Sequence, residues 1–277
     1  MSALNSPAVD KAGKDHWDEA WTRTNLPPVI DPHGRGLNHH FDRAIHSYLQ
    51  GVFGVASRPG SRILEIGCGN SVLLPYLARE FRFEPSGLDY SELGCSRARE
   101  SLARERIDGL IYCEDFFSPS ERLLSQFDIV ISWGVAEHFQ PTSRCLSAFA
   151  AFLKPGGSMV TIVPNMTGLM GALQKAADPA VYEIHVPLDR NALAAAHNQA
   201  GLEVVRSDYL MLFNLNTVNL EGRADRRWYR QAVRLRSWTS KAIWLAEPLL
   251  PFARPNRLTS PLVTCVAIKP IRPTEHA

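Results

Sequence analysis

The sequence has few cysteines, no long apolar run and almost no excess of charge. Its five cysteines form no Cys-x-x-Cys pair, which argues against a disulfide framework and a structural zinc site and is typical of a reducing compartment. No segment reaches the ~18 apolar residues of a membrane-spanning helix, and the first 13 residues lack the apolar core of a signal peptide. We therefore expect a cytoplasmic protein without a metal site.

The charge balance excludes a further class of partner. Thirty lysines and arginines stand against 28 acids, which gives a formal net charge of +2 at neutral pH. Nucleic-acid-binding proteins usually carry a strong basic field, and no aromatic–basic interleaving marks an RNA groove here. We expect no nucleic-acid partner. With 277 residues, 45% of them hydrophobic, the chain can form one large domain with appended segments.

The most informative segment that is present is an apolar stretch ending in a glycine turn. Residues 62–71 read Arg-Ile-Leu-Glu-Ile-Gly-Cys-Gly-Asn-Ser, and a helical pattern follows. This geometry suits an adenosine-bearing cofactor, because Gly67 and Gly69 let the backbone approach the ligand without a Cβ in the way. Val72 stands where a nicotinamide fingerprint needs a small residue, so an NAD-type oxidoreductase is the less favoured alternative.

Two further strand ends carry groups suited to adenosine. A short strand ends at Asp89, about twenty residues past the glycine turn, and Ser91 is placed to cap the next helix. A carboxylate there can accept both ribose hydroxyls, although a turn or capping role is an equal alternative. The strand over residues 110–114 leads into Asp115 and Phe116, which suit an adenine amine and ring; core packing is the alternative for the phenyl ring.

Strands alternate with helical segments along the rest of the chain. We expect further strands over residues 127–132, 158–163, 202–210 and 262–268, with helices over residues 142–153 and 192–200. Asp189 is placed to cap the second of these helices. This alternation predicts an α/β fold with a parallel sheet and helices on both faces.

Taken in order, the motifs resemble the class I S-adenosylmethionine-dependent methyltransferases. They are Glu-x-Gly-x-Gly-Asn-Ser, Leu-Asp-Tyr-Ser, Asp-Phe, Phe-Asp-Ile-Val with the later Glu-His-Phe, and Leu-Lys-Pro-Gly-Gly. The resemblance is strong over roughly residues 60–165 and loose over 185–270. The Glu137-His138 pair is similar to the small-molecule branch that includes ubiquinone-pathway methyltransferases. The resemblance implies a doubly wound, Rossmann-like sheet of seven strands, the last antiparallel, with S-adenosyl-L-methionine as cofactor.

The same resemblance implies the cofactor contacts. Gly67 and Gly69 would hold the methionine end, Asp89 the ribose, and Asp115 with Phe116 the adenine. Many members have a third glycine where this chain has Ser71, which could cap the helix. We interpret Cys68 as a small packing residue within the turn rather than a nucleophile. The full predicted cofactor set is Glu65, Gly67, Cys68, Gly69, Asp89, Tyr90, Asp115, Phe116, Ser132 and Trp133.

Segments outside the sheet are expected to select the acceptor. We predict a disordered N-terminus over residues 1–14, a helical lid over 15–58, and a methyltransferase domain over 59–277. Insertions into this domain, after its fifth and sixth strands, are expected over residues 164–187 and 221–259.

Five residues of these segments are predicted to bind substrate. They are Trp21, His40, Arg43, Tyr182 and Glu183. Trp17 and Trp21 share one helical face, and packing on the sheet edge is an alternative for both. A closed lid would exclude water from methyl transfer.

The second insertion contains an unusual basic segment. Residues 221–241 carry six arginines and one lysine against two acids. A helix over residues 223–249 would align one apolar stripe, made of Trp228, Leu235, Trp238, Ala242, Leu245 and Leu249. Packing or homodimerisation is the favoured interpretation of this stripe, and peripheral contact with a membrane or another anionic partner is the alternative.

These features predict transfer of a methyl group to an O or N atom of a small-molecule acceptor of biosynthetic type. Methyl transfer from a sulfonium is an in-line displacement that needs alignment first. A histidine is the natural base for the acceptor proton, and His138 is the first candidate and His185 the second. Catalysis by proximity alone is an alternative, as are another reaction of the same cofactor and a methyltransferase-like binding or assembly protein that docks through the basic helix.

Overall fold

The computed structural model describes residues 8–54, 58–249 and 252–271, and its centre is a seven-stranded sheet. In spatial order the strands are β4 (Leu110–Cys113), β3 (Glu84–Asp89), β2 (Arg62–Ile66), β5 (Phe127–Trp133), β7 (Leu153–Pro164), β9 (Leu262–Ile268) and β8 (Glu203–Leu210). The pairs from β4 to β7 are parallel, whereas β9 runs antiparallel to both β7 and β8. The predicted fold, with its antiparallel last strand, is confirmed.

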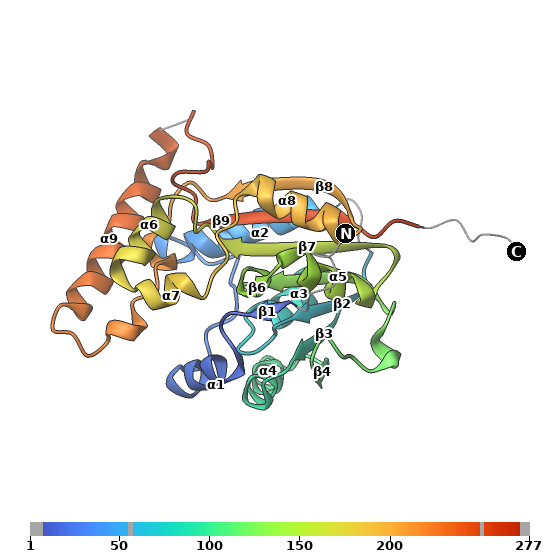
Figure 1. Cartoon of the computed structure of the whole chain (residues 1–277). Coiled ribbons are helices and arrows are strands. Elements are labelled where there is room, and N and C mark those ends of the chain that lie inside the picture. The colour runs from blue at the N-terminus through green and yellow to red at the C-terminus, as the bar shows by residue number, and fades with distance from the viewer. Residues whose placement is uncertain (1–7, 55–57, 250–251, 272–277) are drawn as a thin grey trace, which may run out of the picture.

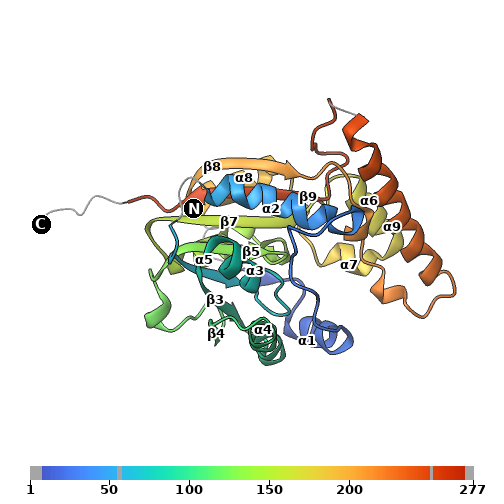
Figure 2. The same cartoon turned by 180° about the vertical axis from the view of Figure 1, so that it is seen from behind.

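Helices cover both faces of the sheet because its central strands are apolar on both sides. On β2, Leu64 and Ile66 belong to one core cluster and Ile63 to the other. The first cluster is covered by α5 (Thr142–Phe152) and α8 (Arg190–Gln199), the second by α2 (His40–Phe53) and α3 (Leu73–Phe81) (Figures 1 and 2). Helix α4 (Glu92–Arg104) packs beside α3 and β3. This layering leaves the carboxyl ends of the parallel strands open for a site.

The predicted helix caps lie where the sequence places them. Ser91 precedes α4 and its Oγ accepts from the Gly94 amide at 2.9 Å. Asp189 precedes α8 and accepts from the amides of Asn191 and Ala192. Each cap satisfies backbone donors that the first helical turn leaves free.

The N-terminal segment departs from the predicted disorder over residues 1–14. Residues 1–7 lie outside the described part of the chain, but β1 (Val9–Asp10) pairs antiparallel with β6 (Phe139–Gln140). Asp10 Oδ1 also accepts the amides of Ala12 and Gly13, which turns the chain into α1 (Lys14–Arg23). Backbone pairing with a distant strand orders this polar segment, although its own sequence has no strand periodicity.

The two insertions form a second layer beyond the sheet. The first contains α6 (Leu169–Ala177) and α7 (Pro179–Glu183), and the second contains α9 (Tyr229–Ala246). Short 3-10 turns complete the described chain: Leu37–His39, Glu121–Leu123, Ala136–His138, Leu215–Thr217, Glu221–Arg223 and Glu247–Leu249. Within the described ranges, none of the helices has the length and apolar character needed to span a bilayer.

Candidate cofactor pocket and active site

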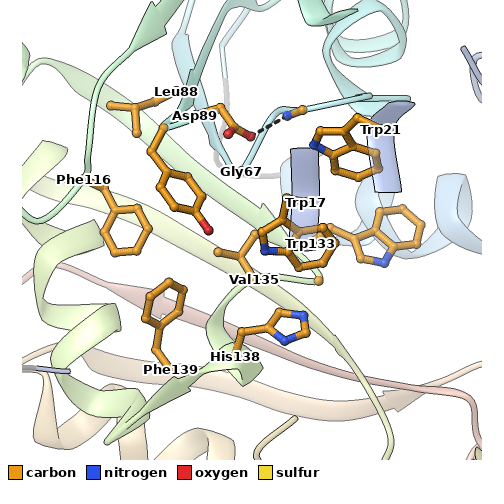
Figure 3. A pocket seen from close by; sticks show the side chains of 13 residues that line it. Trp17, Trp21, Gly67, Leu88, Asp89, Phe116, Trp133, Val135, His138 and Phe139 are labelled. Atoms are coloured by element: carbon orange, nitrogen blue, oxygen red, sulfur yellow. Dashed lines mark hydrogen bonds between the residues drawn. The ribbon is translucent and has the colours of Figure 1, made fainter. Parts of the chain in front are cut away.

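A pocket opens at the carboxyl ends of β2, β3 and β5, beneath α1 (Figure 3). It encloses about 600 Å³ of empty space, its open mouth included. Its lining consists of Trp17, Trp21, Gly67, Gly69, Leu88, Asp89, Tyr90, Phe116, Trp133, Gly134, Val135, His138 and Phe139. This position is the usual ligand site of a doubly wound sheet.

The glycine turn leaves no room for side chains at two positions. Gly67 has φ of +76°, and a Cβ there would lie 2.3 Å from Val135 Cγ2. A Cβ on Gly69 would lie 2.9 Å from both Asp89 Oδ2 and Trp21 Nε1. Both glycines are therefore required by the pocket's own walls, as well as by any ligand that approaches the turn.

Asp89 holds the turn while it faces the pocket. Its Oδ2 accepts the Gly69 amide and its Oδ1 accepts the Ser91 amide, each at 2.8 Å (Figure 3 shows the side chain). Burial raises the pKa of Asp89, and these amide bonds act in the opposite direction. A carboxylate accepts more than two hydrogen bonds, so the turn role and the predicted ribose role are compatible.

Aromatic rings form the wall on the β4 side. The Phe116 ring is buried and packs edge-on against Phe139 with 5.2 Å between ring centroids. Tyr90 donates its hydroxyl to Asp10 Oδ2 at 3.1 Å. Asp115 is exposed and accepts the Phe117 amide instead of lining the pocket. Of the two residues expected to contact the adenine, only Phe116 therefore lies on the pocket wall.

Helix α1 forms the roof through two stacked indoles. The rings of Trp17 and Trp21 lie 5.5 Å apart with an interplanar angle of 26°. Arg97 on α4 holds the end of the helix by donating to the carbonyl oxygens of Trp21 and Thr24, at 2.9 and 2.7 Å. Asp18 accepts a hydrogen bond from Ser91 Oγ. The helix is thus tied to the same loop that carries Asp89.

One donor in this roof is buried without a partner. Among the described residues, Trp21 Nε1 finds no hydrogen-bond acceptor, and it points at the space that a Cβ on Gly69 would fill. A buried unsatisfied N–H costs on the order of 1–3 kcal/mol. An acceptor group of a bound ligand, such as a carboxylate, would satisfy it.

Glu137 and His138 follow β5 and meet His185 from the first insertion. His138 Nδ1 donates to the Ile184 carbonyl oxygen at 2.9 Å, which leaves Nε2 as the acceptor, 3.8 Å from Glu137 Oε1. Burial, reinforced by His185, lowers the pKa of His138 to about 3. Burial also raises the pKa of Glu137 to about 8 and lowers that of His185 to about 4. A neutral imidazole therefore faces the pocket at neutral pH.

The same cluster is the one group in the described chain whose donors could surround a metal ion. The ligand atoms of Glu137, His138 and His185 lie within 4.8 Å of one another, although the sequence predicts no metal. Lys11 opposes a cation here, since its Nζ donates to the His185 carbonyl oxygen at 2.9 Å and its charge helps to lower both histidine pKa values. The cluster suits proton transfer better than metal binding.

Three predicted cofactor residues lie behind the pocket wall. Glu65 is buried and accepts a hydrogen bond from Ser71 Oγ, which in turn caps the start of α3. Cys68 is fully buried and packs with Leu74, as expected for a packing residue. Ser132 is buried, and its Oγ has no partner among the described residues. Their cofactor roles remain predictions.

Four predicted substrate residues lie outside the pocket lining. His40 stacks on Trp244 and contacts Glu247 at 3.1 Å, beside a separate surface hollow that Arg43 also lines. Arg43 donates to the carbonyl oxygens of residues 34 and 36. Tyr182 packs under Lys175, and Glu183 is exposed. Of the five predicted substrate residues, only Trp21 reaches the pocket, so contacts by the others stay predictions.

Several lining residues were not predicted as site residues. Leu88, Gly134, Val135 and Phe139 flank predicted positions by one or two residues in the sequence. Trp17 has a clearer signal, because it lies four residues before Trp21 on one helical face. Proximity to the ends of the predicted strands is the signal that would have found the other four.

Comparisons with known proteins agree with this geometry. A family model described as a methyltransferase domain matches residues 37–207, more than half of the chain. The EEF1A lysine methyltransferase 2 of Danio rerio is 28% identical over 170 residues, which cover 58% of this chain and 72% of that protein. The ubiquinone biosynthesis O-methyltransferase of Bradyrhizobium diazoefficiens is 28% identical over 167 residues, 60% of this chain and 63% of that protein. The chain thus spans roughly two thirds of the length of these curated relatives.

A solved structure extends the likeness to almost the whole fold. The [4+2]-cyclase SpnF superposes with a TM-score of 0.61 at 16% identity, covering 95% of this chain and 97% of that one. At this identity the comparison concerns the fold alone. That protein is named as a cyclase, which illustrates that one fold supports different reactions.

Proposed function

This chain belongs to the class I S-adenosylmethionine-dependent methyltransferases, and from that premise we propose that it methylates an O or N atom of a small molecule. The observation that carries the proposal is the roofed pocket, in which Trp17 and Trp21 lie over the glycine turn at the carboxyl ends of the parallel strands. A concave, mostly apolar lining with a few polar groups is the usual form of a small-molecule site. The net charge of +2 offers little electrostatic attraction for RNA.

The pocket residues fit the cofactor at three places. Gly67 and Gly69 leave space for its methionine end, Asp89 has free lone pairs for the ribose, and Phe116 offers a ring edge or face to the adenine. The unpartnered indole N–H of Trp21 supports the same arrangement, since the methionine carboxylate is an acceptor of suitable charge. S-adenosylmethionine supplies an electrophilic methyl group; the protein supplies alignment and a dry surrounding.

His138 is proposed to receive the proton that the acceptor loses. Its Nε2 is free to accept because Nδ1 is engaged by Ile184, and its ring lies under Trp17 with 5.1 Å between centroids. Glu137, once ionised, would stabilise the resulting imidazolium from 3.8 Å. His185 packs on His138 at 4.5 Å between centroids and is proposed to position it. The low pKa of His138 keeps the base unprotonated, but also makes it a weak one.

Calorimetric titration with S-adenosylmethionine and S-adenosylhomocysteine tests the proposal, with NADH as the control ligand. We expect binding of the sulfonium pair but not of NADH, and loss of at least about tenfold in affinity in Asp89→Ala. Glu84→Ala is the matched control, because Glu84 begins the same strand at its opposite, exposed end. Failure of folded wild-type protein to bind either sulfonium ligand would overturn the proposal. Methylation of a protein or RNA, with no small molecule accepted in a labelled-methyl screen, would overturn its acceptor class.

A further inference from the structure

Helix α9 turns its apolar stripe toward solvent. Four large apolar side chains along it are strongly exposed: Leu235 at 68%, Trp238 at 73%, Leu245 at 69% and Leu249, just beyond the helix, at 80%. These residues, with Ala242 between them, form what we call the exposed stripe. The positions follow one another at alternating spacings of three and four, so they share one helical face.

The opposite face of α9 attaches the helix to the protein. Trp244 is buried and donates its indole N–H to the Phe213 carbonyl oxygen at 2.7 Å. Ser240 donates to the Arg236 carbonyl oxygen and accepts the Leu215 amide. Val233 and Ile243 contact a cluster that includes residues of α6. The exposed stripe is therefore not the anchoring face, and the predicted packing of this stripe on the protein itself is wrong.

Basic side chains flank the exposed stripe without acidic counterparts on the helix. The segment Tyr229–Ala246 contains no aspartate or glutamate, and its Arg230, Arg234 and Lys241 lie beside the stripe, whereas Arg236 donates to the Val218 carbonyl oxygen. Arg230 and Arg234 are exposed, and Arg227 extends the same surface before the helix begins. Phe252, 93% exposed, lies on a hollow next to Ile243 and adds an apolar side chain near the end of α9.

We propose that α9 docks this protein on the surface of an anionic lipid bilayer. The helix would lie in the interfacial plane, with the exposed stripe in the apolar boundary and the arginines at the phosphates, as basic amphipathic helices do. An indole is well suited to that boundary. Figures 1 and 2 both place α9 outermost, with α6 on its inner side, so the helix can meet a flat surface along its length.

Charge favours the bilayer over a second copy of the chain. If two exposed stripes packed against each other, the arginines of both helices would meet near the interface, and α9 holds no carboxylate to pair with them. Like charges across such an interface are destabilising. An anionic lipid surface supplies the missing counter-charge along the whole helix.

Co-flotation of the full chain with lipid vesicles tests this proposal. We expect at least about tenfold more bound protein on vesicles that contain phosphatidylglycerol than on phosphatidylcholine alone, with most of the difference lost at high salt. Leu235→Ser/Trp238→Ser should lose binding to the anionic vesicles. Val205→Ser is the matched control, since Val205 is an equally exposed apolar residue on β8, away from α9.

A charge variant separates the two parts of the surface. Arg230→Gln/Arg234→Gln should reduce binding to anionic vesicles about tenfold or more and weaken its salt dependence, while Arg122→Gln, an exposed arginine elsewhere, should change neither. Absence of wild-type binding to anionic vesicles at low salt would overturn the proposal. So would unchanged binding in Leu235→Ser/Trp238→Ser. A wild-type dimer in light scattering that this variant converts to monomer, without vesicle binding, would assign the surface to a second copy.

Discussion

Two helices outside the sheet carry tryptophans, but one packs them against the protein and the other exposes one of them to solvent. Helix α1 stacks Trp17 and Trp21 over the pocket and is tied down by Arg97 and by the contact between Asp18 and Ser91. Helix α9 is anchored by Trp244 but exposes Trp238 and its neighbours. Both helices are amphipathic in sequence, so the pattern alone does not distinguish them.

The difference lies in the polar contacts that accompany the apolar ones. At α1, the Asp18 carboxylate accepts from Ser91, and the carbonyl oxygens of Trp21 and Thr24 accept from Arg97 on α4, which fixes what the indoles face. In α9, the arginines beside the exposed stripe have no acids on their own helix. Polar groups beside the apolar face of α1 are hydrogen-bonded to the protein itself, which is typical of a helix that covers a pocket. The arginines beside the exposed stripe have no acids on their own helix, which is typical of a surface that docks on an anionic partner.

The largest expected effect concerns the group beneath α1. His138→Ala should lower methyl transfer by up to about a hundredfold, the lower end of what a positioned base contributes, because its low pKa makes His138 a weak base; S-adenosylmethionine binding and vesicle binding should persist. In the wild type the base should be unprotonated well below pH 6.5, because burial lowers the His138 pKa to about 3. The rate should therefore show no acid limb near the ordinary histidine value.

Steady-state kinetics across pH check this expectation. Near-native turnover in His138→Ala would exclude His138 as the general base and leave alignment of the reactants as the explanation for catalysis. His185→Ala is the companion variant, and a smaller loss is expected there since His185 touches His138 without lining the pocket.

The next effect separates the two faces of α9. Trp244→Ala should destabilise the protein by about 3–5 kcal/mol, since it removes a buried indole and its hydrogen bond to Phe213. Trp238→Ala should change the free energy of unfolding by less than about 0.5 kcal/mol, because that ring is exposed. Urea unfolding of both variants measures the difference. Equal losses would mean that the exposed stripe packs against something in solution, and the contrast with α1 would disappear.

The smallest effect concerns the attachment of α1. Arg97→Ala removes the donors to Trp21 and Thr24 and should raise the KM for S-adenosylmethionine roughly five- to tenfold, with kcat nearly unchanged at saturation. Arg99→Ala is the control, since Arg99 lies on the same helix and donates to Ile111 away from the pocket. A kcat loss that saturating cofactor does not repair would show that α1 does more than retain the ligand.

Strong local signals explain which parts of the fold could be predicted from the sequence. The strand over 62–66 places three apolar residues around Glu65 and stops at glycine, and Ser91 and Asp189 are capping residues placed before helical patterns. These features depend on neighbours in sequence. The strand at Val9–Asp10 could not be foreseen, because two residues carry no periodicity and its partner lies about 130 residues further along.

The site residues that could be predicted from the sequence are those at the ends of the predicted strands. Gly67, Gly69, Asp89 and Phe116 all line the pocket, as their positions at the ends of neighbouring strands predict. His40 and Arg43 lie on a helix whose direction is set by packing on β8 and on residues near α9, which no local pattern encodes. The exposed stripe illustrates the same limit, since a helical pattern identifies an apolar face but not what that face meets.

The pairing of β1 with β6 has a consequence for the order in which the chain assembles. Lys11 donates its amide to the His138 carbonyl oxygen and its ammonium to that of His185, 174 residues away. During synthesis this segment leaves the ribosome before the sheet, and the partners that hold it emerge only after most of the strands. The segment that leads into the roof of the pocket is thus synthesised before the residues that hold it, so these contacts can form only after the first insertion has been translated.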